Sequence, residues 1–307
     1  MKTESVHKTV LLKETIEGLN LNKDQSLVID ATFGGGGHSK QILEEYKNTK
    51  IIALDQDKGA WDRAKDKFKG LEKRITFLNL NFREINNKEK VDGIIFYLGL
   101  SSDQLENSGR GFSFMKDEPL LMTMKENPLP EDLTAMDIVN NWGEENLADI
   151  IYGYGEERFS RRIAKAIVEF RKKNQINSTF TLVKIIEDSV PRAYKKGRIH
   201  CATKTFQALR IAVNDELRAL EEGLNKGFEI LKNGGRMSVI SFHSLEDRVV
   251  KRFFKKLEKD KKAKLIPARN ALHSDAGGNK KIITATNEEI KNNGRSRSAK
   301  LRILEKI

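Results

Sequence analysis

Four consecutive glycines follow a short apolar run early in the chain, in the stretch LVIDATFGGGGHS at residues 27–39. The apolar run ends at Asp30, and a helical pattern begins at Ser39, which we expect to be the N-cap of that helix. A strand, a tight turn and a helix N-terminus in this order present backbone N–H groups to a ligand at the carboxyl end of the strand. The same glycines also suit a turn that binds nothing, so the segments that follow decide between the two interpretations.

Apolar runs and helical patterns alternate through the first third of the chain. After the expected strand at residues 27–30, further strands are expected at residues 51–54, 75–80 and 93–98, with a helix at residues 59–68. Near-continuous apolar strands that alternate with helices are typical of a parallel sheet buried on both faces. The sequence therefore predicts an α/β fold.

The pattern changes in the middle of the chain. In residues 105–201, an irregular stretch at residues 110–124 is followed by helical patterns, and no alternation typical of a strand appears. The chain returns to the sheet through a long expected helix at residues 203–231 and an expected strand at residues 236–242. We therefore expect a discontinuous sheet domain, made of residues 1–104 and 202–307, and an inserted all-helical domain for substrate recognition at residues 105–201.

The net charge is +12, and most of it lies near the carboxyl end. Residues 251–307 hold 17 Lys and Arg against 6 Asp and Glu, so the preceding 250 residues are nearly neutral. This distribution favours a polyanionic partner, nucleic acid above all, and a merely solvated lysine-rich surface is the other interpretation. The candidates for phosphate contacts lie in one helical pattern, with Arg161 and Arg162, and alternate along an extended end strand expected at residues 295–302, with Arg295, Arg297, Lys300 and Arg302.

Cys201 is the single cysteine, which excludes an internal disulfide and any zinc site with several cysteine ligands. The five histidines show no metal-ligand spacing. No run approaches the roughly 18 apolar residues that span a bilayer, and the first residues contain no apolar segment of signal-peptide length. We therefore expect a cytoplasmic protein with no metal and no membrane partner.

Asp55 follows the second expected strand, about 20 residues after the glycines. A carboxylate there can bind both ribose hydroxyls of an adenosine ligand, in nicotinamide-dependent dehydrogenases and S-adenosylmethionine methyltransferases alike. A dinucleotide fingerprint requires G-x-G-x-x-G, but Ser39 or Lys40 occupies the third glycine position. Asp30 beside the loop would repel a pyrophosphate and suits the ammonium group of a methionine moiety. The sequence thus favours S-adenosylmethionine as the cofactor, with Asp30 and Asp55 as contacts.

Several longer motifs resemble one protein family, in the same order along the chain. They include DATFGGGGHS, LDQD, DGIIFYLGLSSDQL, RGFSFM, ATKTFQALRIAVNDEL and SFHSLEDRVVKRFF. From about residue 7 to residue 306, the chain resembles the bacterial 16S ribosomal RNA cytosine-N4 methyltransferases of the MraW type. The resemblance implies a Rossmann-like S-adenosylmethionine methyltransferase sheet with an inserted helical domain. It also implies methyl transfer to N4 of a cytidine in the decoding region of 16S ribosomal RNA, within the small ribosomal subunit.

The resemblance also carries over individual cofactor contacts. It implies contacts with Gly36, Gly37 and His38 in the loop, with Asp55 on the ribose, with Phe82 near the adenine, and with Gln104. The family has an aspartate at the end of the fourth strand, where this chain has Tyr97, and its motif P-L-D-M-R-M-D is altered to PLLMTMK at residues 119–125. These departures lead to an alternative expectation, a weak or inactive homologue that acts as an RNA-binding or ribosome-assembly protein.

The exocyclic amine of cytosine is a weak nucleophile, because its lone pair is delocalised into the ring. Methyl transfer to it requires acceptors that take hydrogen bonds from its N–H groups and so direct the lone pair at the methyl group. The candidates are the backbone carbonyls of residues 97–99 and the hydroxyls of Ser101 and Ser102, although both serines equally suit helix N-capping. Tyr97 either stacks on the base or the cofactor, or fills the pocket of an inactive protein. His243, at the end of an expected strand, either touches the target base or makes a structural hydrogen bond.

Overall fold

The computed structural model describes residues 9–22, 25–267 and 282–307. The chain divides into two compact units, each of which is described by itself. Unit 1 consists of Met1–Gly99 and Leu217–Ile307, and unit 2 consists of Leu100–Glu216. Unit 2 is thus inserted into the sequence of unit 1, and it begins directly after the strand that ends near Gly99.

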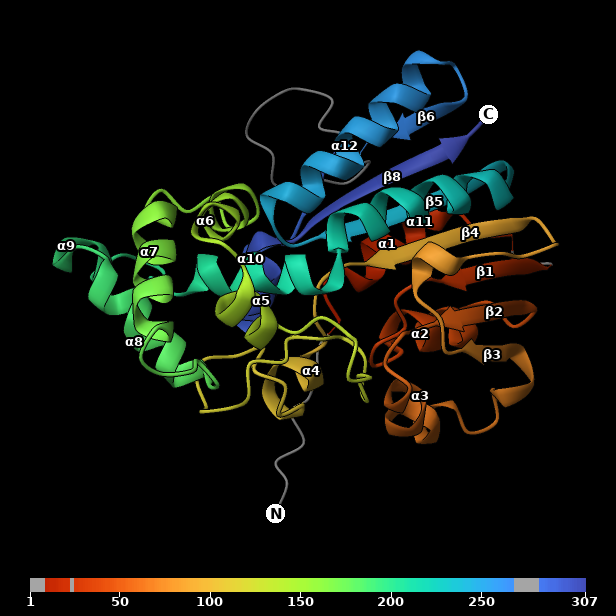
Figure 1. Cartoon of the computed structure of the whole chain (residues 1–307). Coiled ribbons are helices and arrows are strands. Elements are labelled where there is room, and N and C mark those ends of the chain that lie inside the picture. Colours follow the sequence, from red (N-terminus) through yellow and green to blue (C-terminus); the bar gives the residue numbers. More distant parts are fainter. Residues whose placement is uncertain (1–8, 23–24, 268–281) are drawn as a thin grey trace. The chain divides into compact units, whose positions relative to one another are not determined.

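Unit 1 is built on a mixed sheet in which the first five strands are parallel (Figure 1). Its strands are β1 (Ser26–Asp30), β2 (Thr49–Leu54), β3 (Ile75–Leu78), β4 (Val91–Tyr97), β5 (Leu231–Ser241), β6 (Ala263–Ile266), β7 (Ile283–Thr284) and β8 (Lys300–Lys306). They lie in the order β3-β2-β1-β4-β5-β8-β6, and β8 runs antiparallel to β5, β6 and β7. The strand order reverses between β1 and β4, which is where α/β sheets of this kind bind ligands.

Helices cover both faces of this sheet, as the near-continuous apolar strands predict. The helices of unit 1 are α1 (Leu12–Leu19), α2 (Gly37–Glu45), α3 (Gly59–Ala64), α11 (Glu216–Ile230), α12 (Ser244–Lys259) and α13 (Asn287–Asn292). Successive strand residues alternate between two cores, so Val28 packs with α1, α2 and α3, whereas Ile29 packs with α11 and α12. The predicted α/β fold with a Rossmann-like sheet is confirmed.

Two helix boundaries differ from the sequence prediction. Ser39 is not an N-cap, because α2 already begins at Gly37 and the capping position is Gly36. The expected helix at residues 203–231 is two helices, α10 (Thr203–Asn214) and α11, which are separated at Asp215 with a φ of 48°. A left-handed residue that is not glycine is uncommon, and periodicity alone does not reveal it because apolar spacing continues across the break.

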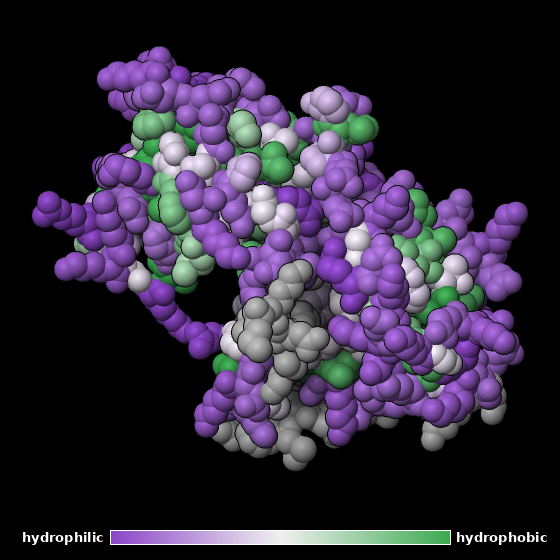
Figure 2. Space-filling view, turned by 90° about the horizontal axis from the view of Figure 1, so that it is seen from below, coloured by the Kyte–Doolittle hydropathy of each residue, from purple (hydrophilic) through white to green (hydrophobic). Residues whose placement is uncertain are grey.

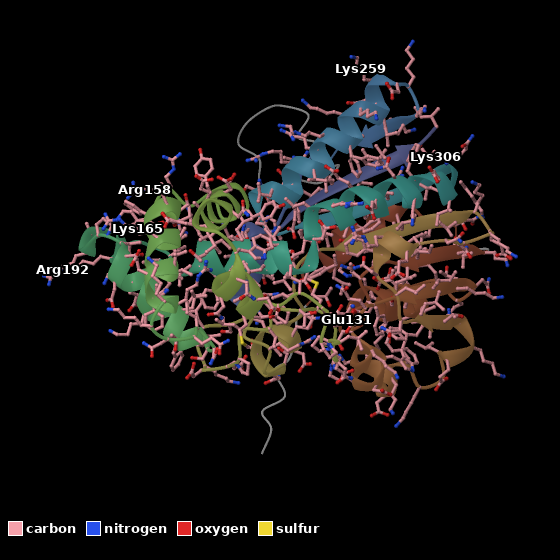
Figure 3. The ribbon with its side chains drawn as sticks, viewed as in Figure 1. Glu131, Arg158, Lys165, Arg192, Lys259 and Lys306 are labelled. Atoms are coloured by element: carbon pink, nitrogen blue, oxygen red, sulfur yellow. The ribbon has the colours of Figure 1, made fainter. Side chains whose placement is uncertain are left out.

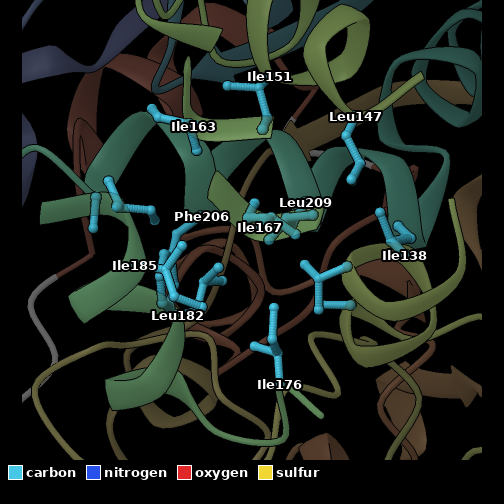
Figure 4. Packing of buried hydrophobic residues seen from close by; sticks show 14 of the residues in the cluster. Ile138, Leu147, Ile151, Ile163, Ile167, Ile176, Leu182, Ile185, Phe206 and Leu209 are labelled. Atoms are coloured by element: carbon cyan, nitrogen blue, oxygen red, sulfur yellow. The ribbon is translucent and has the colours of Figure 1, made fainter. Parts of the chain in front are cut away.

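Unit 2 is helical, as the sequence predicts for the insertion. Its helices are α4 (Ser102–Asn107), α5 (Ala135–Asn141), α6 (Glu144–Gly153), α7 (Ser160–Arg171), α8 (Thr179–Ser189), α9 (Arg192–Lys195) and α10. Figure 4 shows the buried side chains at its centre, among them Ile151 of α6, Ile167 of α7, Leu182 of α8 and Leu209 of α10. Because α10 packs on α5 and α6, residues 202–216 belong to unit 2, outside the expected bounds of the insertion.

The basic residues near the carboxyl end are arranged differently from the expected extended pattern. Arg295 and Arg297 lie in a 3-10 turn, Gly294–Ser298, before β8 begins. Arg302 is only 4% exposed, and its Nε donates to Oδ1 of Asp247 at 2.8 Å. Lys300 donates to the other carboxylate oxygen at 3.2 Å. Arg302 is therefore a structural partner of α12, and its prediction as a phosphate contact is wrong.

We expect Arg302→Ala to lower the free energy of unfolding by about 3 kcal/mol at pH 7, because it leaves a largely buried carboxylate without its main partner. Burial raises the pKa of Asp247, but the hydrogen bonds and charges of Arg302 and Lys300 outweigh burial and hold that pKa below its ordinary value. Ionised Asp247 therefore stabilises the folded protein fully at pH values above the pKa of this side chain in the unfolded chain, near 4. This stabilisation is lost as the pH falls through the lower pKa that Asp247 has in the folded protein.

Urea unfolding at pH 7 and pH 3 measures both effects. Lys300→Ala is the matched control, because the side chain of Lys300 is 41% exposed and should contribute less than about 1 kcal/mol. An Arg302→Ala variant as stable as this control would contradict the assignment.

None of the described helices has both the length and the apolar character that a membrane crossing requires. Figure 2 shows a face of the molecule on which hydrophilic residues make up most of the surface and hydrophobic residues form scattered patches.

Candidate cofactor-binding site

The glycine turn after β1 depends on glycine at three positions for two reasons. Gly34 and Gly36 have positive φ angles of 51° and 70°, which side-chain-bearing residues rarely adopt. A Cβ on Gly36 would also lie 2.7 Å from the ring of Phe33, and a Cβ on Gly37 would collide with Oγ1 of Thr9. The turn is therefore packed tightly by the chain's own side chains, and its backbone conformation requires glycine.

Asp55 directly follows β2 and connects it to the glycine turn. Its Oδ2 accepts a hydrogen bond from the N–H of Gly34 at 2.7 Å, and its Oδ1 accepts one from the N–H of Asp57 at 2.9 Å. Burial raises the pKa of Asp55 to about 6, even though these two backbone hydrogen bonds oppose the shift. Asp55 is nevertheless partly exposed, so the sheet edge carries a carboxylate of fixed orientation that a ligand can reach.

Asp30, the last residue of β1, is more deeply buried than Asp55. Its Oδ2 accepts a hydrogen bond from the hydroxyl of Ser39 at 2.6 Å, and its Oδ1 accepts one from the N–H of Thr32 at 3.3 Å. Burial raises the pKa of Asp30 to about 6. Both oxygens thus hold the turn and the first part of α2 together, and a contact with the ammonium group of a ligand stays a prediction.

Phe82 lies at the same edge, in the 3-10 turn Phe82–Glu84 after β3. Its ring packs edge-on against Phe96 of β4 with centroids 5.8 Å apart. A Cβ on Gly223 of α11 would lie 2.7 Å from this ring, so glycine there lets the helix approach it. Phe82 keeps part of its surface exposed, which suits an aromatic side chain beside an adenine.

Tyr97 occupies the end of β4, where the resembling family has an aspartate. Its ring lies between those of His38 and Phe242, with centroid distances of 5.5 Å and 5.0 Å. Its phenol oxygen accepts a hydrogen bond from the backbone N–H of Val10, and burial raises the pKa of Tyr97 to about 12. Tyr97 therefore anchors the segment before α1 to the sheet edge, a role that the sequence did not reveal.

The remaining predicted site residues act as helix caps. Ser101 is the N-cap of α4, and its Oγ accepts a hydrogen bond from the N–H of Gln104 at 3.1 Å. The side chain of Gln104 accepts from the N–H of Ser101 at 3.0 Å, which completes a capping box, and Ser102 is the first residue of the helix. In unit 1, His243 caps α12 in the same reciprocal manner with Glu246. Catalytic roles for Ser101, Ser102 and His243 stay predictions.

One cluster in unit 2 was missed because its members are not spaced like a metal motif. Ligand atoms of Glu187, His200 and Cys201 lie within 4.8 Å of one another. The Nδ1 of His200 accepts a hydrogen bond from the N–H of Ala202 at 3.2 Å, and its Nε2 lies 3.3 Å from a carboxylate oxygen of Glu187. Because Nδ1 accepts a hydrogen bond, the proton of a neutral ring lies on Nε2, which faces the Glu187 carboxylate. Both ring nitrogens of His200 thus have partners within the protein.

The residues of unit 1 fit an adenosine-bearing ligand. Asp55 offers a partly exposed carboxylate for the ribose hydroxyls, held by the N–H of Gly34, and Phe82 offers an aromatic surface from the next loop. Both follow parallel strands on the same side of the reversal between β1 and β4. Gly36, Gly37 and His38 complete the turn and the first residues of α2.

The chain is similar to known proteins in sequence and in fold. The chain is 42% identical to the Ribosomal RNA small subunit methyltransferase H of Lactobacillus johnsonii, over 98% of this chain and 99% of that protein. Among solved structures, NSun6 from Pyrococcus horikoshii aligns with a TM-score of 0.50 and 13% identity, over 98% of this chain and 53% of that chain. An rRNA methylase from Streptococcus thermophilus aligns with a TM-score of 0.46 and 11% identity, over 99% of both chains. The model of the MraW methylase family matches residues 4–307, and the chain belongs to that family.

Proposed function

We propose that this chain transfers a methyl group from S-adenosylmethionine to N4 of a cytidine in the decoding region of 16S ribosomal RNA. The observation that carries the proposal is the Asp55 carboxylate, oriented by the N–H of Gly34 beside the strand-order reversal. Membership of the MraW methylase family and the 42% identity with the Ribosomal RNA small subunit methyltransferase H of Lactobacillus johnsonii support a methyltransferase that acts on small-subunit ribosomal RNA. Such an enzyme works in the cytoplasm, where its RNA substrate is assembled.

S-adenosylmethionine, when bound, supplies an electrophilic methyl group on a sulfonium. Asp55 would accept hydrogen bonds from the ribose hydroxyls, and Phe82 would provide an apolar surface for the adenine. The backbone carbonyls of residues 97–99 would accept hydrogen bonds from the N–H groups of the cytosine amine and so keep its lone pair directed at the methyl carbon. Catalysis by the protein therefore consists of positioning, because a direct displacement from a sulfonium needs no covalent help from a side chain.

Incubation of small ribosomal subunits that lack this modification with the protein and methyl-labelled S-adenosylmethionine tests the proposal. We expect label in the small-subunit RNA and none in the RNA of large subunits treated in the same way. Binding of RNA and cofactor without any transfer would instead support the second candidate, a ribosome-assembly protein that has lost turnover. That candidate is favoured by one observation, the Tyr97 ring held between His38 and Phe242.

Cofactor affinity is expected to depend on pH through Asp55. The raised pKa of Asp55, about 6, means that the carboxylate is ionised above pH 6 and becomes protonated below it. Ionised carboxylates make stronger hydrogen bonds to hydroxyl groups than protonated ones do. Calorimetric titration should therefore give a constant affinity from pH 7 to 8 and a decline of about tenfold by pH 5. The decline should be clearly smaller in Asp55→Asn, where of the two carboxylates only Asp30 still titrates in this range, and an unchanged affinity in the wild type at pH 5 would contradict the role.

A further inference from the structure

Charge is strongly segregated within unit 2, although the unit as a whole is almost neutral. Residues 100–156 contain 3 Lys and Arg against 12 Asp and Glu, whereas residues 157–204 contain 13 Lys and Arg against 4 Asp and Glu. A solvated surface without a partner typically interleaves both signs. The basic half comprises α7, α8 and α9, so the helical unit presents a cationic surface that the overall charge of the sequence conceals.

Eight of these cations are exposed and surround one junction between α7 and α9. They are Arg158, Arg161, Arg162 and Lys165 at the start of α7, and Arg192, Lys195, Lys196 and Arg198 in and after α9. Among the residues that the structure describes, none of the eight forms a salt bridge with a carboxylate. Figure 3 shows Arg158, Lys165 and Arg192 extending outward from this part of unit 2. We call these eight residues the α7–α9 surface.

The junction is built so that its cations have defined positions. The guanidinium of Arg158 lies over the rings of Phe159 and Tyr194, at 4.7 Å and 5.0 Å from their centroids. Glu157 is buried beneath them, where it accepts hydrogen bonds from the Tyr194 hydroxyl and from the N–H of Phe159. This buried carboxylate fixes α9 against the start of α7. Arg158 is consequently preorganised while it stays exposed, which lowers the entropic cost of binding an anion.

The placement of the cations also opposes helix stability. The first turn of α7 contains Arg161 and Arg162 and no acidic residue, although the macrodipole disfavours positive charge at a helix N-terminus. Cations at this end do not serve to stabilise the helix. Together with the positive end of the helix macrodipole, they provide a favourable environment for a phosphate group.

We propose that the α7–α9 surface binds the phosphodiester backbone of the substrate RNA, which rests on the proposed function and assigns its RNA contacts to unit 2. Such contacts set affinity and orientation without reading the sequence of bases. The residues of this surface are not the phosphate-contact candidates near the carboxyl end, one of which, Arg302, is buried against Asp247. The surface therefore supplies RNA affinity from a part of the chain outside the basic carboxyl-terminal residues.

The test removes four charges from the surface and compares RNA binding over a range of salt concentrations. Arg161→Ala, Lys165→Ala, Arg192→Ala and Lys196→Ala are combined, since these exposed residues lie one turn apart in pairs and make no contact with the Arg158 stack. The probe is small-subunit ribosomal RNA. We expect affinity at low salt to fall by at least about tenfold, and the slope of log affinity against log salt to fall by about three.

Two further variants complete the experiment. Lys255→Ala, Lys256→Ala, Lys259→Ala and Lys262→Ala remove the same charge from exposed positions on and after α12 and should change the slope by less than one. Exchange of Lys for Arg, and Arg for Lys, at the four surface positions should retain wild-type binding. The proposal is overturned if the surface variant binds like the wild type, or if it loses no more than the α12 variant.

Cofactor titration and methyl transfer are measured on the same proteins. Cofactor affinity should be equal in the wild type and the surface variant, because Asp55 is held by Gly34 and Asp57 of unit 1, which the variant leaves unchanged. A wild type that binds RNA with the predicted salt dependence but never transfers a methyl group would refute the proposed function and leave the surface intact. The two hypotheses therefore fail in different measurements.

Discussion

Asp55→Asn is expected to lower the affinity for S-adenosylmethionine by about 100-fold. A hydrogen bond to a charged group contributes about 1.5–3 kcal/mol, and the two ribose hydroxyls of the cofactor would both donate to this carboxylate. Asparagine keeps the size of the side chain, but it replaces one acceptor by a donor. Because Oδ1 and Oδ2 already receive the N–H groups of Asp57 and Gly34, the amide also opposes one of these two groups.

Asp92→Asn is the matched control for this variant. Like Asp55, Asp92 accepts a hydrogen bond from a backbone N–H far away in the sequence, that of Leu27 at 2.8 Å. Asp92 lies at the start of β4, whereas Asp55 follows the end of β2. Calorimetric titration should show an unchanged affinity in Asp92→Asn, and thermal unfolding shows whether either variant is misfolded. An Asp55→Asn protein that is folded and binds the cofactor within twofold of the wild type would refute the site.

Tyr97→Asp is expected to raise the rate of methyl transfer at least about tenfold, measured as kcat/KM on small subunits. A carboxylate at the end of β4 can accept a hydrogen bond from an N–H group of the cytosine amine. It also stabilises the positive charge that develops on the amine nitrogen, which a neutral phenol does less well. The substitution also removes the hydrogen bond from Val10 and the contacts with His38 and Phe242. We therefore expect a loss of about 2 kcal/mol in the free energy of unfolding at the same time.

Tyr97→Asn and Tyr97→Phe separate the two effects. Asparagine should lose stability as aspartate does, without the gain in rate, because it carries no negative charge. Phenylalanine keeps the ring and loses only the hydrogen bond from the N–H of Val10, so it should leave the rate within about threefold of the wild type. A folded Tyr97→Asp protein whose kcat/KM equals or falls below that of the wild type would show that the missing carboxylate does not limit the rate.

The sheet and its ligand edge could be predicted from the sequence because their signals are local. Continuous apolar runs without polar alternation, separated by helical patterns, predict a parallel sheet. The carboxyl ends of its strands meet at one edge. Asp30, Asp55 and Phe82 each follow or end a strand, so their common location follows from topology alone. The helices α5 to α8 of the insertion could likewise be predicted from periodicity.

Most side-chain roles that the sequence did not reveal depend on contacts with residues far away in the chain. Arg302 is buried and paired with Asp247, 55 residues earlier. Nothing in the alternating basic pattern of the end strand indicates that Arg302 is buried. Tyr97 bonds to Val10, which lies in a different part of the sequence. The break at Asp215 is bridged by Arg210 and Glu216 at 2.8 Å, a local pair that periodicity cannot distinguish from a continuous helix.

The distribution of charge gives the clearest example. The sequence places a surplus of cations in residues 251–307, but the fold decides which cations are exposed and unpaired. In unit 2 the acidic and basic halves cancel in the total, and only the packing of α9 on the start of α7 gathers the eight cations around one junction. Net charge along a chain therefore locates a binding surface less well than the exposure and pairing of the individual side chains.

Identification of the methylated nucleoside tests the central claim most directly. Small subunits lacking the modification are treated with the wild-type protein and S-adenosylmethionine, and their RNA is then digested to nucleosides and analysed by mass spectrometry. The account predicts N4-methylcytidine at one position of the decoding region, and none when Asp55→Asn replaces the wild type at the same cofactor concentration. A methyl group on carbon 5 of a pyrimidine or on another base, or no methylation by a protein that binds both ligands, would contradict it.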